Sequence, residues 1–341
     1  MKISKFFLIN TLFLIILVSG CHNAANPYIK SVVNDVNEVY LREHITQLTS
    51  IGSRFSNHEN SVGSVYISNP NAQAQKIAYL SKCLEDYGYN VHQSVFNVSP
   101  LYGGKGINLI AFKKGTVEPE KVLELGAHYD TYANPGADDN CSGVAGVLEA
   151  ARILSKIPTE KSIRFCLYDL EEVGNHLGSK HHVILVKNKS LNSKDEIFDG
   201  IINLDMIGYA TDQKNTQKTP IRIPLFIDPP RTGNFILIVG NFESSYLGSD
   251  FELAIKKYAD DLNYFSAKHI GGWFADANRS DQASYWKNDL PAIMITDTGE
   301  FRSSYYHQNS DSIETLNFIF LSQVVKATLG TILEYAEPVN N

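Results

Sequence analysis

The 341-residue sequence has few cysteines, no cluster of basic residues, no repeats and no series of long apolar runs, and each of these absences excludes a class of protein. It contains only four cysteines, and their spacing shows no paired motif, so a scaffold built on disulfides is excluded. Basic side chains number 30 against 37 acidic ones and form no cluster, which argues against a nucleic-acid partner. Internal repeats and a series of bilayer-length apolar runs are absent, so repeat arrays and polytopic membrane proteins are excluded. A hydrophobic content of 43% indicates a globular protein with a sizeable core.

The cysteines beyond the N-terminal segment lie in surroundings typical of structural thiols. Cys166 falls inside an apolar strand-like run, and Cys141 follows a loop of small residues. Buried thiols are therefore expected at both positions. A Cys141–Cys166 bridge in an oxidising compartment is the alternative.

The N-terminus has the pattern of an export signal. Lys2 and Lys5 precede an apolar run over residues 6–18, and two small residues then lead to Cys21. This run is shorter than the roughly 20 residues that a bilayer-spanning helix needs. The segment resembles a bacterial lipoprotein signal, which is cleaved before a cysteine that then carries the lipid.

This resemblance divides the chain into three parts. Residues 1–20 would be the lipoprotein signal peptide, residues 21–30 a polar tether and residues 31–341 the folded domain. Acylated Cys21 would hold an exported protein on a membrane, at the periplasmic or extracellular face. An ordinary signal peptide or an uncleaved anchor is the alternative.

Downstream, helical and strand-like patterns alternate. Helical patterns cover residues 32–48, 72–87, 142–156, 176–186, 249–258 and 318–336. Strand-like runs cover residues 91–98, 107–112, 122–127, 162–168, 201–206, 235–239 and 292–296. Several of these strands are almost continuously apolar, as in a sheet covered on both faces.

The alternation predicts a single-domain α/β sandwich with a largely parallel, twisted central sheet and helices on both faces. Two early strands separated by Gly103 and Gly104 are expected to pair antiparallel at one edge. Residues 50–71 show no apolar period and are expected to form a loop, and residues 209–233 a surface excursion.

Polar residues interrupt the sequence where predicted strands end. In open α/β sheets, binding sites collect at the carboxyl ends of the strands. The residues in such places are His128, Asp130, Asp138, Asp139, Asp169, Glu171, Glu172, Asp205, Tyr306 and His307. Imidazole and carboxylate groups together favour zinc or a similar divalent ion, and an aspartate can bridge two ions. A lone histidine here would be weak evidence, but Asp205 follows a buried run, where an unpaired carboxylate is costly.

The order and spacing of these motifs resemble the zinc aminopeptidases of peptidase family M28, whose catalytic domain is one α/β sandwich with two zinc ions. The matching segments are residues 126–131, 136–143, 169–172, 203–208 and 306–311. The resemblance implies one zinc ion on His128 and Asp205, a second on Glu172 and His307, and Asp139 as the bridge.

Roles for further residues are implied in the same way. Glu171 would be the general base, and Asp130 would hold the ring of the first histidine through its second nitrogen. Tyr306 would donate a hydrogen bond to the developing oxyanion, and Arg279 would lie near the substrate. Gln282 departs from the family pattern, in which many members have histidine, so no role is carried over to it.

The sequence therefore predicts a metal-dependent aminopeptidase that acts on peptides. A glutaminyl-peptide cyclotransferase is the first alternative, because such enzymes resemble this fold and keep similar ligands. The segment 140–143 looks like the peptidase form. A catalytically inactive binding protein of the same fold is the second alternative, although such proteins usually lose ligands that this chain retains.

Overall fold

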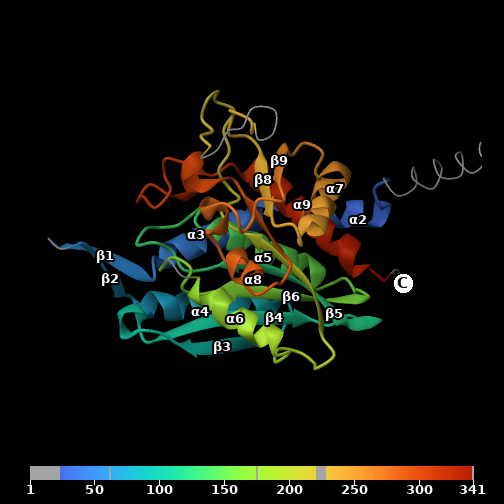
Figure 1. Cartoon of the computed structure of the whole chain (residues 1–341), viewed down its shortest axis with the longest axis horizontal. Helices are drawn as coiled ribbons and strands as arrows, with labels where there is room; N and C mark the ends of the chain where they lie inside the picture. Colours follow the sequence, from blue (N-terminus) through green and yellow to red (C-terminus); the bar gives the residue numbers. More distant parts are fainter. Residues whose placement is uncertain (1–23, 61–62, 174–175, 220–227, 340–341) are drawn as a thin grey trace, which may run out of the picture.

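An eight-stranded sheet runs through the computed structural model, which describes residues 24–60, 63–173, 176–219 and 228–339 (Figure 1). The strand order is β3-β4-β6-β5-β7-β10-β8-β9. The strands are β3 (Val91–Asn97), β4 (Lys105–Lys113), β5 (Glu118–His128), β6 (Lys161–Tyr168), β7 (Ile197–Leu204), β8 (Ile236–Gly240), β9 (Tyr264–Ala267) and β10 (Ala292–Thr296). β6, β5, β7 and β10 are parallel neighbours, whereas β3 and β4 pair antiparallel at the edge, as predicted.

Helices cover both faces of the sheet, as expected for strands without a polar face. The larger layer consists of α2 (Pro27–Val33), α3 (Glu38–Ile51), α4 (Pro70–Asp86), α5 (Cys141–Leu154), α7 (Ser245–Tyr258) and α9 (Phe318–Ala336), which share one apolar core with the sheet. On the opposite face, α6 (Leu177–Lys187) and α8 (Gln282–Trp286) enclose a smaller core.

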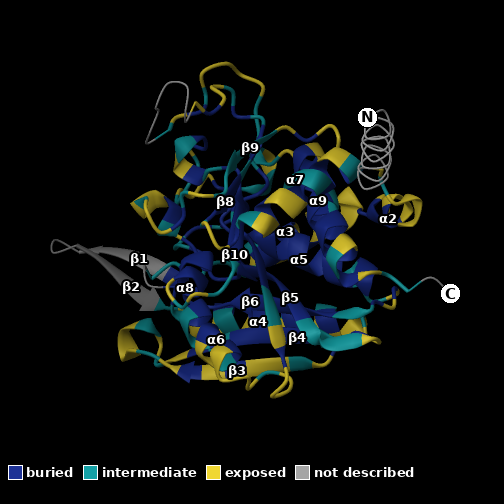
Figure 2. Cartoon of the chain, turned by 45° about the vertical axis from the view of Figure 1, so that its right-hand side comes forward, coloured by how far each residue is buried: buried dark blue, intermediate teal, exposed yellow. Residues whose placement is uncertain are grey.

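Helix α5 lies at the centre of the larger layer and places its N-terminus at the carboxyl ends of the strands. Asn140 caps it by accepting a hydrogen bond from the Gly143 amide at 3.0 Å. Its residues are mostly small, and all of them except Arg152 are buried. Figure 2 accordingly shows α5 as dark blue, whereas β3 at the sheet edge is largely exposed.

The folded part begins earlier than the sequence predicts. Asn26 accepts hydrogen bonds from two backbone amides and starts α2 at Pro27, and Ile29 is only 2% exposed. The tether predicted over 21–30 is therefore wrong from Pro27 onward. The segment predicted as one helix over 32–48 spans the end of α2 and most of α3, because α2 ends at Val33 and Asn37 caps a new helix that begins at Glu38.

Three further differences concern short elements. The loop predicted over 50–71 contains a two-stranded hairpin, β1 (Phe55–Asn60) with β2 (Gly63–Ser68). β9 and α8 were not predicted, because they are too short to show a period and lack the continuous apolar run that identifies β8 and β10. In the excursion 209–233, the described residues form neither helix nor strand, as expected.

The predicted export signal and Cys21 lie outside the described residues. Within the described ranges, no helix combines the length and apolar character needed to cross a membrane. Cys83, Cys141 and Cys166 are free thiols and the last two are buried, so the Cys141–Cys166 bridge does not form.

Candidate metal centre

Five side chains predicted as metal ligands come together at the carboxyl ends of the sheet. His128 ends β5, Asp139 precedes α5, Glu172 follows β6, Asp205 follows β7, and His307 lies in the connection after β10. They form two groups of three with Asp139 in both. The sequence thus identified every member of this cluster, although its residues span 180 positions of the chain.

The shared aspartate uses one oxygen in each group. Its Oδ1 lies 3.4 Å from His128 Nε2, and its Oδ2 lies 3.2 Å from His307 Nε2. Asp205 Oδ1 completes the first group at 3.6 Å from His128 Nε2, and Glu172 Oε2 completes the second at 3.1 Å from His307 Nε2. Tetrahedral ligands about 2.0–2.1 Å from one zinc ion lie about 3.3 Å apart, so these spacings suit a zinc ion in each group.

The loop that carries Asp139 is held by two polar side chains. The Asp311 carboxylate accepts hydrogen bonds from the backbone amides of Asp138 and Asp139, at 2.9 and 3.2 Å. Asn140 donates to the Leu204 carbonyl and accepts from the Met206 amide, at 2.9 and 3.1 Å. These contacts fix Asp139 relative to the segment that carries Asp205.

The charges of the cluster demand a cation. Burial raises the pKa of Glu172 to about 8, and the charge of Asp139 adds to the shift. Burial alone would lower the pKa of His307, but its contacts with Asp139 and Glu172 raise it to about 10. Glu172 Oε1 is buried without a hydrogen-bond partner among the described residues. The donor set therefore fits divalent metal ions, which would supply the missing charge and the missing contacts.

Asp130 lies beside the cluster, but its carboxylate acts differently from the prediction. His128 Nδ1 donates to the backbone carbonyl of Asp130 at 3.1 Å, while the carboxylate Oδ1 is 3.7 Å away. This carbonyl contact fixes the tautomer that leaves Nε2 free to bind metal. The Asp130 carboxylate instead accepts from the backbone amides of Glu171 and Glu172, at 3.1 and 3.2 Å. It therefore holds the backbone of Glu171 and Glu172 in place.

Glu171 lies beside these candidate ligands. Together with His128, Asp139, Glu172 and Asp205, it lines a pocket that is described below. Burial raises its pKa well above the usual range, and the nearby charges of Glu172 and Asp205 reinforce this effect over the opposing influence of His128. Its Oε1 lies 3.5 Å from Nε2 of His176, a buried residue that the sequence analysis did not identify. A carboxylate in such surroundings is suited to accept a proton once cations offset the crowded negative charge.

Tyr306 and Arg279 are also brought to the site. The Tyr306 ring stacks on the His307 ring with their centroids 3.8 Å apart. Arg279 Nη2 donates to the Tyr306 hydroxyl oxygen at 3.2 Å, and both terminal nitrogens of Arg279 contact Glu300. Gln282 is buried and donates to the Ala277 carbonyl at 2.9 Å, so its place in the site is structural.

A pocket of about 230 Å³ extends from the metal ligands into the protein. Much of its wall is apolar, formed by Phe235, Leu237, Val239, Phe265, Ile270, Phe274 and Met294. Phe274 lies in this wall, whereas its neighbour Trp273 is 85% exposed. The contributions of β8 and β9 were missed, because they depend on how distant strands pair.

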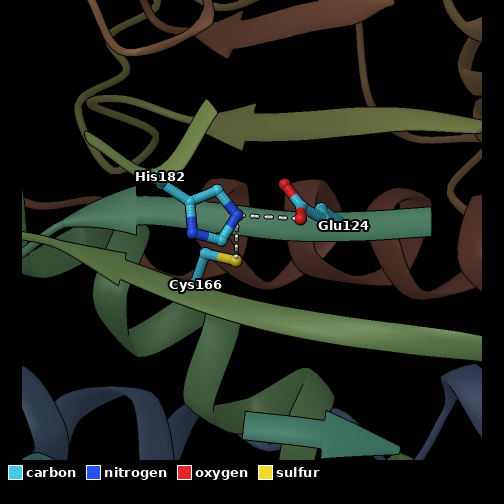
Figure 3. Close-up of side chains that lie close together, drawn as sticks. All are labelled: Glu124, Cys166 and His182. Atoms are coloured by element: carbon cyan, nitrogen blue, oxygen red, sulfur yellow. Dashed lines mark hydrogen bonds and ion pairs between the residues drawn. The ribbon is translucent and has the colours of Figure 1, made fainter. Parts of the chain in front are cut away.

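A second group of potential ligands lies deeper in the protein, on the α6 side of the sheet (Figure 3). His182 Nε2 is 2.9 Å from Glu124 Oε1 and 3.6 Å from Cys166 Sγ. Arg164 Nε and Tyr285 Oη also donate to the Glu124 carboxylate, both at 2.5 Å. This carboxylate is saturated by protein donors, so the group fits a structural hydrogen-bond network better than a metal site.

Comparison with known proteins gives consistent matches. The sequence profile of peptidase family M28 matches residues 108–332. The protein YfbL of Escherichia coli (strain K12) is 32% identical over 243 residues, covering 67% of this chain and 71% of YfbL. Aminopeptidase YwaD of Bacillus subtilis (strain 168) is 40% identical over 103 residues, which is 30% of this chain and 22% of YwaD.

Solved structures share the fold. The zinc aminopeptidase BSAP from Bacillus subtilis aligns with a TM-score of 0.65 at 16% identity, covering 88% of this chain and 95% of BSAP. A glutaminyl cyclase from Fimbriiglobus ruber aligns with a TM-score of 0.64 at 18% identity, covering 87% of this chain and 95% of that chain. These likenesses confirm the predicted α/β sandwich, and at such identities they concern the fold alone.

Proposed function

The chain belongs to peptidase family M28, as its motifs predicted, and we propose that it is an aminopeptidase that uses two zinc ions. The observation that carries this proposal is the position of Asp139, which directs one oxygen to His128 and the other to His307. Two metal positions sharing one carboxylate, beside a buried glutamate and an apolar pocket, fit the hydrolysis of a peptide bond.

The chain's own residues have separate roles in the reaction. Zinc, when bound, makes water acidic enough to react near neutral pH and polarises the scissile carbonyl. Glu171 accepts the proton of the attacking water and returns it to the leaving amine. Asp130 holds the Glu171 backbone in place, and Tyr306 donates a hydrogen bond to the oxygen on which negative charge develops.

The pocket supports a preference at the cleaved residue. Much of its described wall is aromatic and aliphatic, so a large apolar N-terminal side chain gains most from being buried against it. Leucyl, methionyl and phenylalanyl substrates are therefore expected to react faster than aspartyl or lysyl ones.

The test is a screen of aminoacyl amides and N-terminal glutaminyl peptides with and without a chelator. We expect release of free amino acids, fastest from apolar residues, that is abolished by chelation and restored by zinc. The shared fold of a glutaminyl cyclase makes cyclisation the second candidate. Formation of pyroglutamate without release of amino acids would replace the peptidase assignment, and activity in metal-free protein would contradict both.

We also propose that Cys21 is the lipid-bearing N-terminus of an exported, membrane-anchored protein. The support is the sequence pattern of two lysines, a short apolar run and small residues before the cysteine. Mass spectrometry of the membrane fraction should identify an acylated Cys21 peptide. Cys21→Ala should release active enzyme, whereas a mature chain that starts at another residue would contradict the proposal.

A further inference from the structure

Glu300 and Arg279 form a bidentate ion pair at the rim of the pocket. Arg279 Nη1 lies 2.5 Å from Glu300 Oε1, and Arg279 Nη2 lies 2.7 Å from Glu300 Oε2. The two side chains are 42% and 39% exposed. An exposed arginine without such a partner samples many rotamers, whereas paired N–H groups on one carboxylate select a single orientation of the guanidinium plane.

The backbone around Glu300 fixes the other end of the pair. Glu300 lies in the turn η3 (Gly299–Phe301), directly after β10. The Gly299 amide donates to the buried Asp297 carboxylate at 3.0 Å, and the Phe301 carbonyl accepts from the Lys218 amide at 2.7 Å. The turn that carries Glu300 is therefore held by Asp297, which follows β10, and by the excursion beside the pocket.

The orientation of Arg279 determines how the Tyr306 hydroxyl can act. A guanidinium group has only donors, so the Tyr306 oxygen is the acceptor in its 3.2 Å contact with Arg279 Nη2. The hydroxyl hydrogen must then point elsewhere, and the hydrogen bonds of the described residues include no acceptor for it. Tyr306 lines the pocket beside Glu171 and the metal ligands, so this hydrogen is available to a substrate oxygen.

We propose that Glu300 is a positioning residue for the hydrolytic step, because it holds Arg279 where Arg279 donates to Tyr306 and leaves the Tyr306 hydrogen for the oxyanion. This inference rests on the proposed function, in which Tyr306 stabilises that oxyanion. It extends the site to a residue outside the matched motifs, in a separate turn after β10.

The experiment compares Glu300→Gln with a matched control at the same arginine. Asp276 also approaches Arg279 Nη1, but at 3.8 Å and through one oxygen. We expect Glu300→Gln to lower kcat roughly tenfold while KM stays within about twofold, because the lost interaction matters in the transition state. Asp276→Asn should change kcat by less than about twofold. Zinc content and thermal unfolding, measured for both variants, establish that the fold is intact.

A double-mutant cycle with Tyr306→Phe separates positioning from a general structural effect. Tyr306→Phe alone should lower kcat about 10²-fold, the usual loss for one oxyanion donor. If Glu300 acts through Tyr306, adding Glu300→Gln to Tyr306→Phe should cause no further loss.

Three results would overturn the inference: unchanged kcat in Glu300→Gln, a loss that adds in full to that of Tyr306→Phe, or a rise in KM with unchanged kcat. If wild-type protein released no amino acid from any substrate, the proposed function would itself be wrong and the role of Glu300 with it. That outcome is distinct, since the first three require an active wild-type enzyme.

Discussion

Strand β5 carries two histidine–carboxylate clusters that look alike in composition and differ in chemistry. At its end, His128 meets Asp139 and Asp205, and four residues earlier Glu124 meets His182. In the metal centre, the pKa of Glu172 rises to about 8 because of burial and the charge of Asp139. In the inner cluster, burial would raise the pKa of Glu124, but His182 and Arg164 lower it to about 2.

The difference lies in the supply of protein donors. Arg164, His182 and Tyr285 all contact the Glu124 carboxylate, so its charge is compensated within the fold. In the outer cluster, negatively charged oxygens face one another, and Glu172 Oε1 has no hydrogen-bond partner among the described residues. The spacing of the potential ligands would allow a metal ion in either cluster. A metal centre is distinguished from a structural network by whether its buried polar atoms already have hydrogen-bond partners in the protein.

The largest effect is expected from Glu171→Gln, which alters the outer cluster without removing a ligand. The amide keeps the shape of the side chain but cannot accept the proton, so kcat should fall at least 10²- to 10⁴-fold, roughly the range for general acid–base catalysis. Steady-state kinetics and elemental analysis should show lost turnover with zinc retained. Near-normal turnover, or loss of metal, would contradict the role of Glu171.

Glu172→Gln tests the neighbouring ligand. The amide binds zinc less well than a carboxylate, so the group containing His307 should lose its ion while the group containing His128 keeps one. Elemental analysis should show a decrease from two zinc ions per chain toward one, with reduced activity at limiting zinc. An unchanged zinc content would mean that Glu172 is not a ligand.

Glu124→Gln tests the inner cluster and should affect stability instead of catalysis. The change leaves the buried charge of Arg164 with Glu196 as its remaining partner, so the free energy of unfolding should fall by about 3 kcal/mol. Urea unfolding measures this loss, and kcat per folded molecule should be unchanged. The control is Glu337→Gln at the more exposed pair with Lys161, which should cost under about 1 kcal/mol. Equal losses in the two variants would show that burial of the Glu124 pair is irrelevant.

The pH dependence of the free energy of unfolding should reflect the ionisation of Glu124 in the inner cluster. The pKa of Glu124 is about 2 in the fold and 4.5 ordinarily, so its contribution is complete above about pH 4.5. It is lost as the pH falls from 4.5 to 2, by about 3 kcal/mol in total. Unfolding measured across this window should be less pH-dependent in Glu124→Gln than in wild type. Parallel profiles would mean that folding does not lower the pKa of Glu124.

The smallest effect is expected from Cys166→Ala, which removes the third member of the inner cluster. If Cys166 only packs, stability should fall by about 1 kcal/mol and the zinc content should stay constant. Thermal unfolding and elemental analysis check both points. Loss of one metal equivalent would show that the inner cluster binds metal after all.

The sequence predicted which five side chains come together in this cluster, because they end strands or lie in the polar connections that follow them. Asp205 directly follows a buried run. An unpaired carboxylate there is costly, so a partner for it was expected. Asp130 was assigned to the wrong contact, because a motif gives the distance along the chain but not whether a carbonyl or a carboxylate meets the ring. Its actual contact, to the amides after β6, depends on the pairing of two strands.

Features that depend on long-range geometry could not be predicted. Asp311 holds the Asp139 loop from more than 170 positions away, and Glu300 reaches Arg279 from another connection. The short strand β9 and the buried start of α2 also obtain their stability from packing against distant elements. Local periodicity carries no information about such contacts.

The position of β10 in the sheet has a consequence for synthesis of the protein. β8 and β9 are made first, yet in the described sheet they join the remaining strands only through β10. A nascent chain that ends before residue 292 therefore cannot complete its sheet, and one that ends before His307 lacks a ligand of the second metal position. The ribosome must pass both points before the proposed two-metal centre can form, so the growing polypeptide lacks a complete set of candidate ligands until 307 of its 341 residues have been made.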